Sequence, residues 1–162
     1  MILLINFEEI TKNIESGLKQ YLLCPVIKGN QVNKPPRFPY IVYNIMTLTE
    51  NKGTWQEHND LVDRKQAVMT ISFSSHSDTY KNSLELSMKA REWLDLVGTT
   101  YLNERGIIVQ SVSDIHDRSN FVTIEYMYSY GFDCFIWIYD EVNHPAEEIG
   151  TIETVELSGK EI

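Results

Sequence analysis

The feature that most constrains the fold is a run of strand-forming residues that is too long for a compact domain. Residues 121–140 read FVTIEYMYSYGFDCFIWIYD, and most of them are aromatic or β-branched. At about 3.3 Å per residue, a straight strand over residues 121–139 would be roughly 60 Å long. A compact chain of 162 residues has a radius of gyration of about 15 Å and a diameter near 40 Å. The run must therefore bend within the domain or extend beyond it.

Gly131 and Asp133 interrupt this run. Alternate residues from Val122 to Ile138 form one continuous apolar and aromatic face. The opposite face is polar as far as Asp133 and apolar from Phe135 onward, so the strand passes from one covered face to two. A glycine inside a strand is suited to a bulge or a bend. The sequence therefore predicts a bulge or bend at Gly131.

The excess length beyond Asp133 is predicted to contact another subunit, because a strand longer than its domain can pair with the edge of a neighbour. Phe135, Trp137 and Tyr139 are the candidate contact residues of this segment. Trp55 and His58 lie in the polar segment 49–65 and are the other candidates, since tryptophan is enriched at the centres of interfaces. Alternatively, Trp55 folds back onto the core of its own chain.

The rest of the sequence predicts two helices and three further strands. Asn6 and Glu9 have the spacing of a capping box, and Gly98 stands where helices commonly end. The predicted helices are 7–22 and about 79–97, and the strands are 40–48, 66–74 and 107–115. The first two strands can form an antiparallel hairpin with a long loop. The fold class is therefore α+β, a mainly antiparallel sheet with two helices packed on it, in the order α-β-β-α-β-β.

The composition changes from residue 143 onward. Residues 143–162 contain five glutamates, one lysine and no aromatic residue. We expect a folded domain over 1–142 and an acidic C-terminal tail over 143–162, with a short strand near Thr151–Leu157. The net charge of the whole chain is −9. This charge opposes tight non-specific binding to nucleic acid, but it allows a protein that surrounds DNA without holding it.

The two cysteines, Cys24 and Cys134, fit no metal-binding spacing. We interpret both as small buried residues of a reducing compartment, with a single disulfide between them as the open alternative. The N-terminal MILLINFEEI lacks the charged start and cleavage site of a signal peptide. Apolar stretches of the length that crosses a membrane are also missing. We expect a protein made in the cytoplasm, with no membrane partner.

The groups of polar residues do not predict catalysis. Ser74, Ser75, His76 and Asp78 suggest a nucleophilic triad, but a strand end followed by a helix N-cap at Ser77 or Asp78 explains them. His116 and Asp117 are typical of a polar hairpin turn. Glu57, His58, Asp60 and Asp63 match no known cation loop. We expect no enzyme activity, no cofactor and no metal site.

Three segments in order resemble a known family. They are PPRFPYIVYNI at 35–45, QAVMTISFSSHSDTY at 66–80 and GIIVQSVSDIHDRSNFVTIEYMYSYGFDCFI at 106–136. Together they resemble the bacteriophage neck and tail-terminator (head–tail joining) proteins over residues 1–140, so the domain 1–142 is expected to be tail-terminator-like. The matching positions are expected to be architectural: Pro39, Tyr40, Asp117, Arg118, Gly131, Phe132 and Asp133.

The resemblance implies a structural protein of the virion of a tailed phage or prophage. Members form a ring, typically a hexamer, that stops polymerisation of the tail tube and joins the tail to the head. The implied partners are further copies of the chain, the tail tube protein and the head connector proteins. DNA passes through without specific binding. Assembly is expected in the cytoplasm of the host bacterium, and the family has no catalytic residues.

Two other classes of function remain open from the sequence. An acidic adaptor or inhibitor that mimics nucleic acid would bind a basic protein partner, and it would concentrate its acidic side chains on one outer face. A small hydrolase would use His76 or His116, and alanine at either position would abolish turnover without changing the fold.

Overall fold

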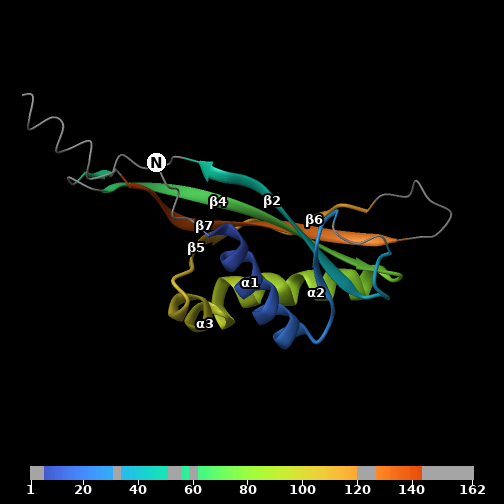
Figure 1. Ribbon diagram of the computed structural model, residues 1–162. Coiled ribbons are helices and arrows are strands. Elements are labelled where there is room, and N and C mark those ends of the chain that lie inside the picture. The colour runs from blue at the N-terminus through green and yellow to red at the C-terminus, as the bar shows by residue number, and fades with distance from the viewer. Residues whose placement is uncertain (1–5, 31–33, 51–55, 59–61, 120–126, 144–162) are drawn as a thin grey trace, which may run out of the picture.

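Two long antiparallel strands, β4 (Val62–Ser77) and β7 (Tyr128–Asn143), form the centre of a single sheet. The computed structural model describes residues 6–30, 34–50, 56–58, 62–119 and 127–143. Within these residues β4 and β7 are paired along their whole lengths, from Ser77 opposite Tyr128 to Val62 opposite Asn143. The length of β7 is therefore matched by an equally long partner (Figure 1).

Shorter strands flank this central pair. They are β1 (Val26–Lys28), β2 (Tyr40–Glu50), β3 (Gln56–His58), β5 (Ile108–Val112) and β6 (His116–Asp117). The order is β1-β2-β4-β7-β5, with β3 paired to β4 and β6 paired to β7. The pair of β1 and β2 is parallel, and the other pairs are antiparallel. The predicted α+β class with a mainly antiparallel sheet is confirmed, as is the antiparallel pairing of β2 with β4.

The helices all lie on one face of the sheet (Figure 1). They are α1 (Phe7–Leu22), α2 (Tyr80–Glu92), the π-helical turn η1 (Trp93–Val97) and α3 (Thr99–Glu104). The predicted cap of α1 is confirmed, because Asn6 Oδ1 accepts a hydrogen bond from the Glu9 N–H at 3.1 Å. The predicted cap of α2 is wrong. Thr79 Oγ1 accepts from the Asn82 N–H at 3.3 Å, and Ser77 still belongs to β4.

The core fills the space between the helices and the sheet. Phe73 and Phe132 stack at its centre, with 5.5 Å between ring centroids. The apolar residues of α2 do not all face the core, because Tyr80 and Met88 are each 55% exposed. The residues that α2 and η1 bury are Ser83, Leu86, Ser87, Ala90, Trp93 and Leu94. Serines on this face let the helix lie close to β4, where Ser75 Oγ donates to the Ser83 carbonyl oxygen at 2.6 Å.

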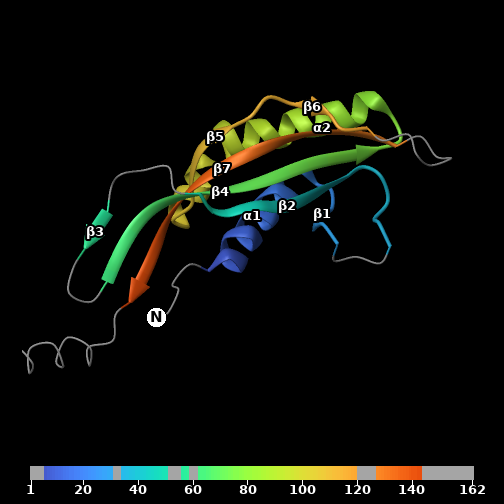
Figure 2. The same ribbon diagram turned by 90° about the horizontal axis from the view of Figure 1, so that it is seen from above.

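The predicted bulge at Gly131 is wrong. The register between β4 and β7 continues without a shift through Ser74 opposite Gly131. The other neighbour of β7 does show a shift of register. It lies in β5, between Val109 and Ser111. Because the register is continuous between β4 and β7, the excess length is not absorbed by a bulge, and the two strands curve together (Figure 2).

The excess length instead forms a projecting arm, visible in Figure 2 beyond the helices. The arm consists of β3, residues 62–66 of β4 and residues 139–143 of β7. The sequence pattern placed all of 49–65 in a loop, whereas β2 continues to Glu50 and the arm uses both β3 and the start of β4. The predicted start of the long strand at residue 121 lies outside the described residues, and β7 begins at Tyr128.

Candidate assembly surfaces

In the part of the chain that the structure describes, the outer edge of β7 is open along the arm. β5 pairs with β7 only as far as Ile108 opposite Trp137. From Ile138 to Asn143, the side of β7 that faces away from β4 carries no paired strand among the residues that the structure describes. Such an edge presents backbone N–H and C=O groups that can pair with another chain.

The residues predicted to contact another subunit are only partly described. Phe135 and Trp137 are half-buried on β7, opposite Thr70 and Val68 of β4. Both lie on the face of the sheet that is turned away from the helices, because Phe132, Cys134 and Ile136 of the alternate positions join the core. Tyr139 pairs with Gln66 in the arm. His58 ends β3 opposite Asp63, and Trp55 lies outside the described residues.

Arg118 crosses the helix-free face of the sheet. It follows β6 directly, and its guanidinium reaches over β7 to β4. Nη1 donates to Ser72 Oγ at 2.6 Å and to Ser74 Oγ at 3.1 Å, while Nη2 bonds Asp133 Oδ1 at 3.2 Å. Arg118 thus links β6 to both β7 and β4. The ion pair with Asp133 is half-exposed, so the hydrogen bonds to the serines matter as much as the charge.

Gly131 lies beneath this guanidinium. A Cβ atom at this position would stand 2.5 Å from the Phe73 carbonyl oxygen and 2.7 Å from Arg118 Nη1. The glycine therefore provides space for Arg118. Its neighbour Phe132 points to the opposite face and is 1% exposed within the core. The structure thus brings Arg118, Gly131 and Asp133 into one cluster.

The remaining positions carried over from the resemblance lie at two separate places. Asp117 is exposed in β6, and its Oδ1 accepts from the Ser119 N–H at 2.8 Å. Hydrogen bonds from Ser119 lower the pKa of Asp117. Pro39 is exposed just before β2, after a cis peptide bond with Phe38. Tyr40 is buried, with its ring stacked on Phe38 at 5.6 Å.

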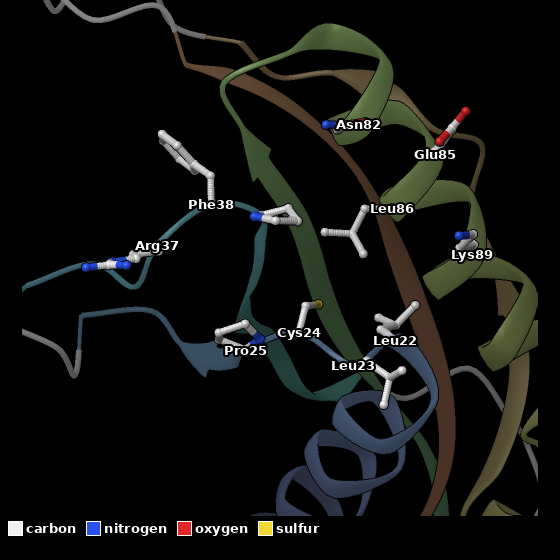
Figure 3. Close-up of a pocket in the computed structure, with 11 residues that line it drawn as sticks. Leu22, Leu23, Cys24, Pro25, Arg37, Phe38, Asn82, Glu85, Leu86 and Lys89 are labelled. Atoms are coloured by element: carbon white, nitrogen blue, oxygen red, sulfur yellow. The ribbon is translucent and has the colours of Figure 1, made fainter.

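A groove of about 550 Å³ opens where α1 ends, beside α2 and the segment before β2 (Figure 3). Its apolar wall comes from Leu22, Cys24, Pro25, Phe38 and Leu86. Cys24 and Leu86 point toward one another across it. Its charged lining residues are Arg37, Glu85 and Lys89. Sequence periodicity did not indicate this groove, because its parts come from three segments that only the fold brings together.

Leu23 makes the groove unusually apolar for a surface. Its side chain is 88% exposed, and its backbone adopts the left-handed conformation with φ of 54° at the end of α1. The Leu23 N–H donates to the Lys19 carbonyl oxygen at 3.0 Å, which closes the last helical turn. A leucine held outward in this way is available for contact with another chain.

Neither cysteine forms a disulfide. Cys24 is half-buried at the groove, so the expectation that it is fully buried is wrong. Cys134 is buried in the core, where burial raises the pKa of its thiol to about 12. A thiol with this pKa is unreactive at neutral pH.

The two histidines of the hydrolase hypothesis lie on β4 and β6. His76 lies near the end of β4, where its ring packs against Tyr40 at 5.1 Å. Burial lowers the pKa of His76. His116 is exposed in β6, opposite Gly131. Within the described ranges, no group of three or more His, Cys, Asp or Glu residues could hold a metal ion. A search of the helices in the same ranges finds none long and apolar enough to cross a membrane.

The family model described as phage neck terminator protein matches residues 12–162, which is nearly the whole chain. The match includes the acidic segment after residue 143. None of the curated proteins matches the chain. The family's description is that of a structural component of the phage neck, and not of an enzyme.

Proposed function

This chain belongs to the phage neck terminator family, and we propose that its copies assemble into a ring. The ring ends the tail tube and joins the tail to the head. The observation that carries the proposal is the outer edge of β7 in the projecting arm, with which no other described strand pairs from Ile138 to Asn143. The unpaired N–H and C=O groups of such an edge can pair with a segment of another chain.

The geometry of the arm favours a ring over a two-fold dimer. The arm leaves the domain at one end of the sheet, whereas the helices lie over the rest of it (Figure 2). The groove lies beside α1 and α2, away from the arm. A neighbour that accepts the arm on a different surface makes a head-to-tail contact. Contacts of this kind repeat from copy to copy and close into rings when the rotation permits. A ring of six subunits is the expectation from the resemblance.

The charge of the chain suits a passage for DNA. With a net charge of −9, the ring does not neutralise phosphates and so does not retain the genome as it passes. The partners in this proposal are the tail tube protein on one side and the head connector proteins on the other. The protein is then a component of the virion, assembled in the cytoplasm of the host bacterium.

Native mass spectrometry across a concentration series, together with electron microscopy of purified tail tubes incubated with the protein, tests the proposal. We expect a closed oligomer of one size and tubes capped at one end by a ring. A strictly monomeric protein that leaves the ends of tubes bare would overturn it.

A further inference from the structure

The groove and the C-terminal segment differ in charge. Arg37, Lys89 and Glu85 line the groove, and residues 24–40 add Lys28 and Lys34 and no acidic residue. Residues 144–162, which follow β7 in the sequence, contain five acidic residues and one lysine. Asp140 and Glu141 of the arm lie opposite Lys65 and Arg64 of β4, so the acidic excess belongs to the segment after the arm. The charges of the groove and of this segment are therefore complementary between copies of the chain.

The groove exposes apolar side chains and has basic side chains without ion-pair partners among the described residues. Leu23 is 88% and Phe38 is 41% exposed beside its apolar wall. Of its charged residues, Glu85 is already within 3.9 Å of Lys81. Neither Arg37 nor Lys89 has an ion-pair partner within the described residues. The groove therefore fits a segment that carries both apolar and acidic side chains.

The C-terminal segment of the chain has this composition. Residues 147–157 read EEIGTIETVEL, in which Ile149, Ile152, Val155 and Leu157 are interspersed with four glutamates. In an extended segment alternate side chains lie on one side, so Ile149, Val155 and Leu157 can face the groove together with Glu147 and Glu153. One side of the segment thus offers apolar groups to the groove wall and carboxylates to its basic residues.

Distance determines which copy supplies the segment. The groove lies beside Pro39, and the next residue, Tyr40, is level with His76 and Ser129 across the sheet. From Ser129 to Asn143, β7 covers roughly 46 Å at 3.3 Å per residue. Glu153 is ten residues beyond Asn143 and can reach at most about 35 Å from it. Most of the segment is therefore too short to reach the groove of its own chain.

We propose that the groove beside α1 and α2 binds residues 147–157 of a second copy of the chain. This inference rests on the proposed ring, in which it supplies the head-to-tail contact. The basic, apolar groove of one copy receives the acidic segment that follows the arm of the next. The same contact repeated around the ring leaves no groove empty.

A disulfide trap tests the contact in the full chain. Cys24 lines the groove, and Val155→Cys places a second thiol in the segment. Under mild oxidation at pH 8.5, we expect disulfide-linked dimers and longer ladders on a non-reducing gel. The matched control is the Cys24→Ser/Val155→Cys variant, in which ladders should fall at least fivefold. A disulfide within one chain, or equal yields in both variants, would overturn the inference.

A charge exchange tests the recognition separately. Lys89→Glu in the Val155→Cys chain should lower the ladder yield severalfold, and adding Glu153→Lys should restore most of it. Lys12→Glu makes the same change of charge at an exposed position of α1 and should leave the yield unchanged. Equal effects of Lys89→Glu and Lys12→Glu would contradict a specific contact.

The outcomes also separate this inference from the proposed function. Rings seen by native mass spectrometry without a Cys24-dependent ladder would overturn the groove contact and leave the ring intact. A Cys24-dependent ladder between copies without closed rings would support the contact and overturn the proposed ring.

Discussion

Gly131 and Arg118 show how a single missing side chain can determine which strands are joined. A guanidinium has five N–H donors in a planar fork, so it can bond several strands at once if it lies flat on the sheet. The absence of a Cβ at Gly131 provides that space. Arg118 then reaches Ser72 and Ser74 of β4 while still bonded to Asp133 of β7.

Gly131→Ala should therefore destabilise the fold by about 1–3 kcal/mol, the usual cost of overfilling a packed site. The added Cβ would meet both a backbone oxygen and the guanidinium, and only the guanidinium can move. Urea unfolding measures the change in the free energy of unfolding. In an Arg118→Ala background the same substitution should cost less, because one of the two clashes is gone. Equal costs in both backgrounds would show that Arg118 does not need this space.

His76 gives the fold a dependence on pH. Burial lowers its pKa in the folded protein below the ordinary value of 6.5. Below pH 6.5 the unfolded chain binds a proton that the folded chain does not, so the free energy of unfolding should fall as the pH drops from 7 toward 5. Above pH 7 this contribution is fully present and constant.

The measurement is a series of urea unfolding curves between pH 7.5 and 5.5 on the wild type and on His76→Phe. Phenylalanine keeps a ring against Tyr40 but does not titrate. We expect a shallower slope of stability against pH in the variant. Identical slopes would assign the pH dependence to other groups.

At the level of elements, the sequence predicted the long helices and strands and missed the short ones. The spacing and composition of the apolar residues indicated α1, α2, β2, β4, β5 and β7. They did not indicate β1, β3, β6 or α3, which are too short to show a period. The glycine at 131 suggested a bulge because sequence alone does not show that Arg118 lies above it.

The π-helical turn η1 shows a further limit of sequence patterns. The Gly98 N–H donates to the Trp93 carbonyl oxygen at 2.7 Å, a bond across five residues. The ring of Trp93 is packed so closely that a Cβ at Gly17 or at Gly98 would lie within 2.5 Å of it. Gly98 thus has a packing role, and its φ of −89° is open to any residue.

Gly17→Ala tests this packing, because the sign of the change in the free energy of unfolding depends on it. Alanine favours an isolated helix over glycine by about 1 kcal/mol. Here the added Cβ would overlap the Trp93 ring, so we expect a net loss of roughly 1–2 kcal/mol in the free energy of unfolding. Ser16→Ala, at the exposed neighbouring position, should be neutral or slightly stabilising. A stabilising Gly17→Ala would mean that α1 moves away from Trp93 at little cost.

At the scale of the whole molecule, the sheet has a covered face and an open one. All helices lie on one side, and the half-buried rings of Phe135 and Trp137 lie on the other. The sequence pattern indicated that this second face changes character after Asp133. It could not indicate a neighbouring subunit, because burial by another chain and burial by the same chain leave the same pattern of apolar residues.

Trp137→Glu separates these two kinds of burial. If the ring contacts another subunit, the variant should keep a thermal midpoint within a few degrees of the wild type but lose the oligomer in native mass spectrometry. Met88→Glu changes a 55% exposed residue on the outer side of α2 and should affect neither. A loss of monomer stability that accompanies the loss of assembly would make Trp137 a core residue.

The pairing of β4 with β7 also determines when the protein can fold. Ser77 pairs with Tyr128 and Val62 with Asn143, so each pair at the centre of the sheet joins residues more than fifty positions apart. Contacts between distant residues form slowly, because the intervening chain must be ordered first. During synthesis β4 leaves the ribosome before β7, so at first β2 is the only one of its two long partners that is available to pair with it. Within the arm β3 pairs with β4 locally, whereas the pairs between β4 and β7 join residues that are still farther apart. We therefore expect the β7 side of the arm to form last, after each copy has completed its own core.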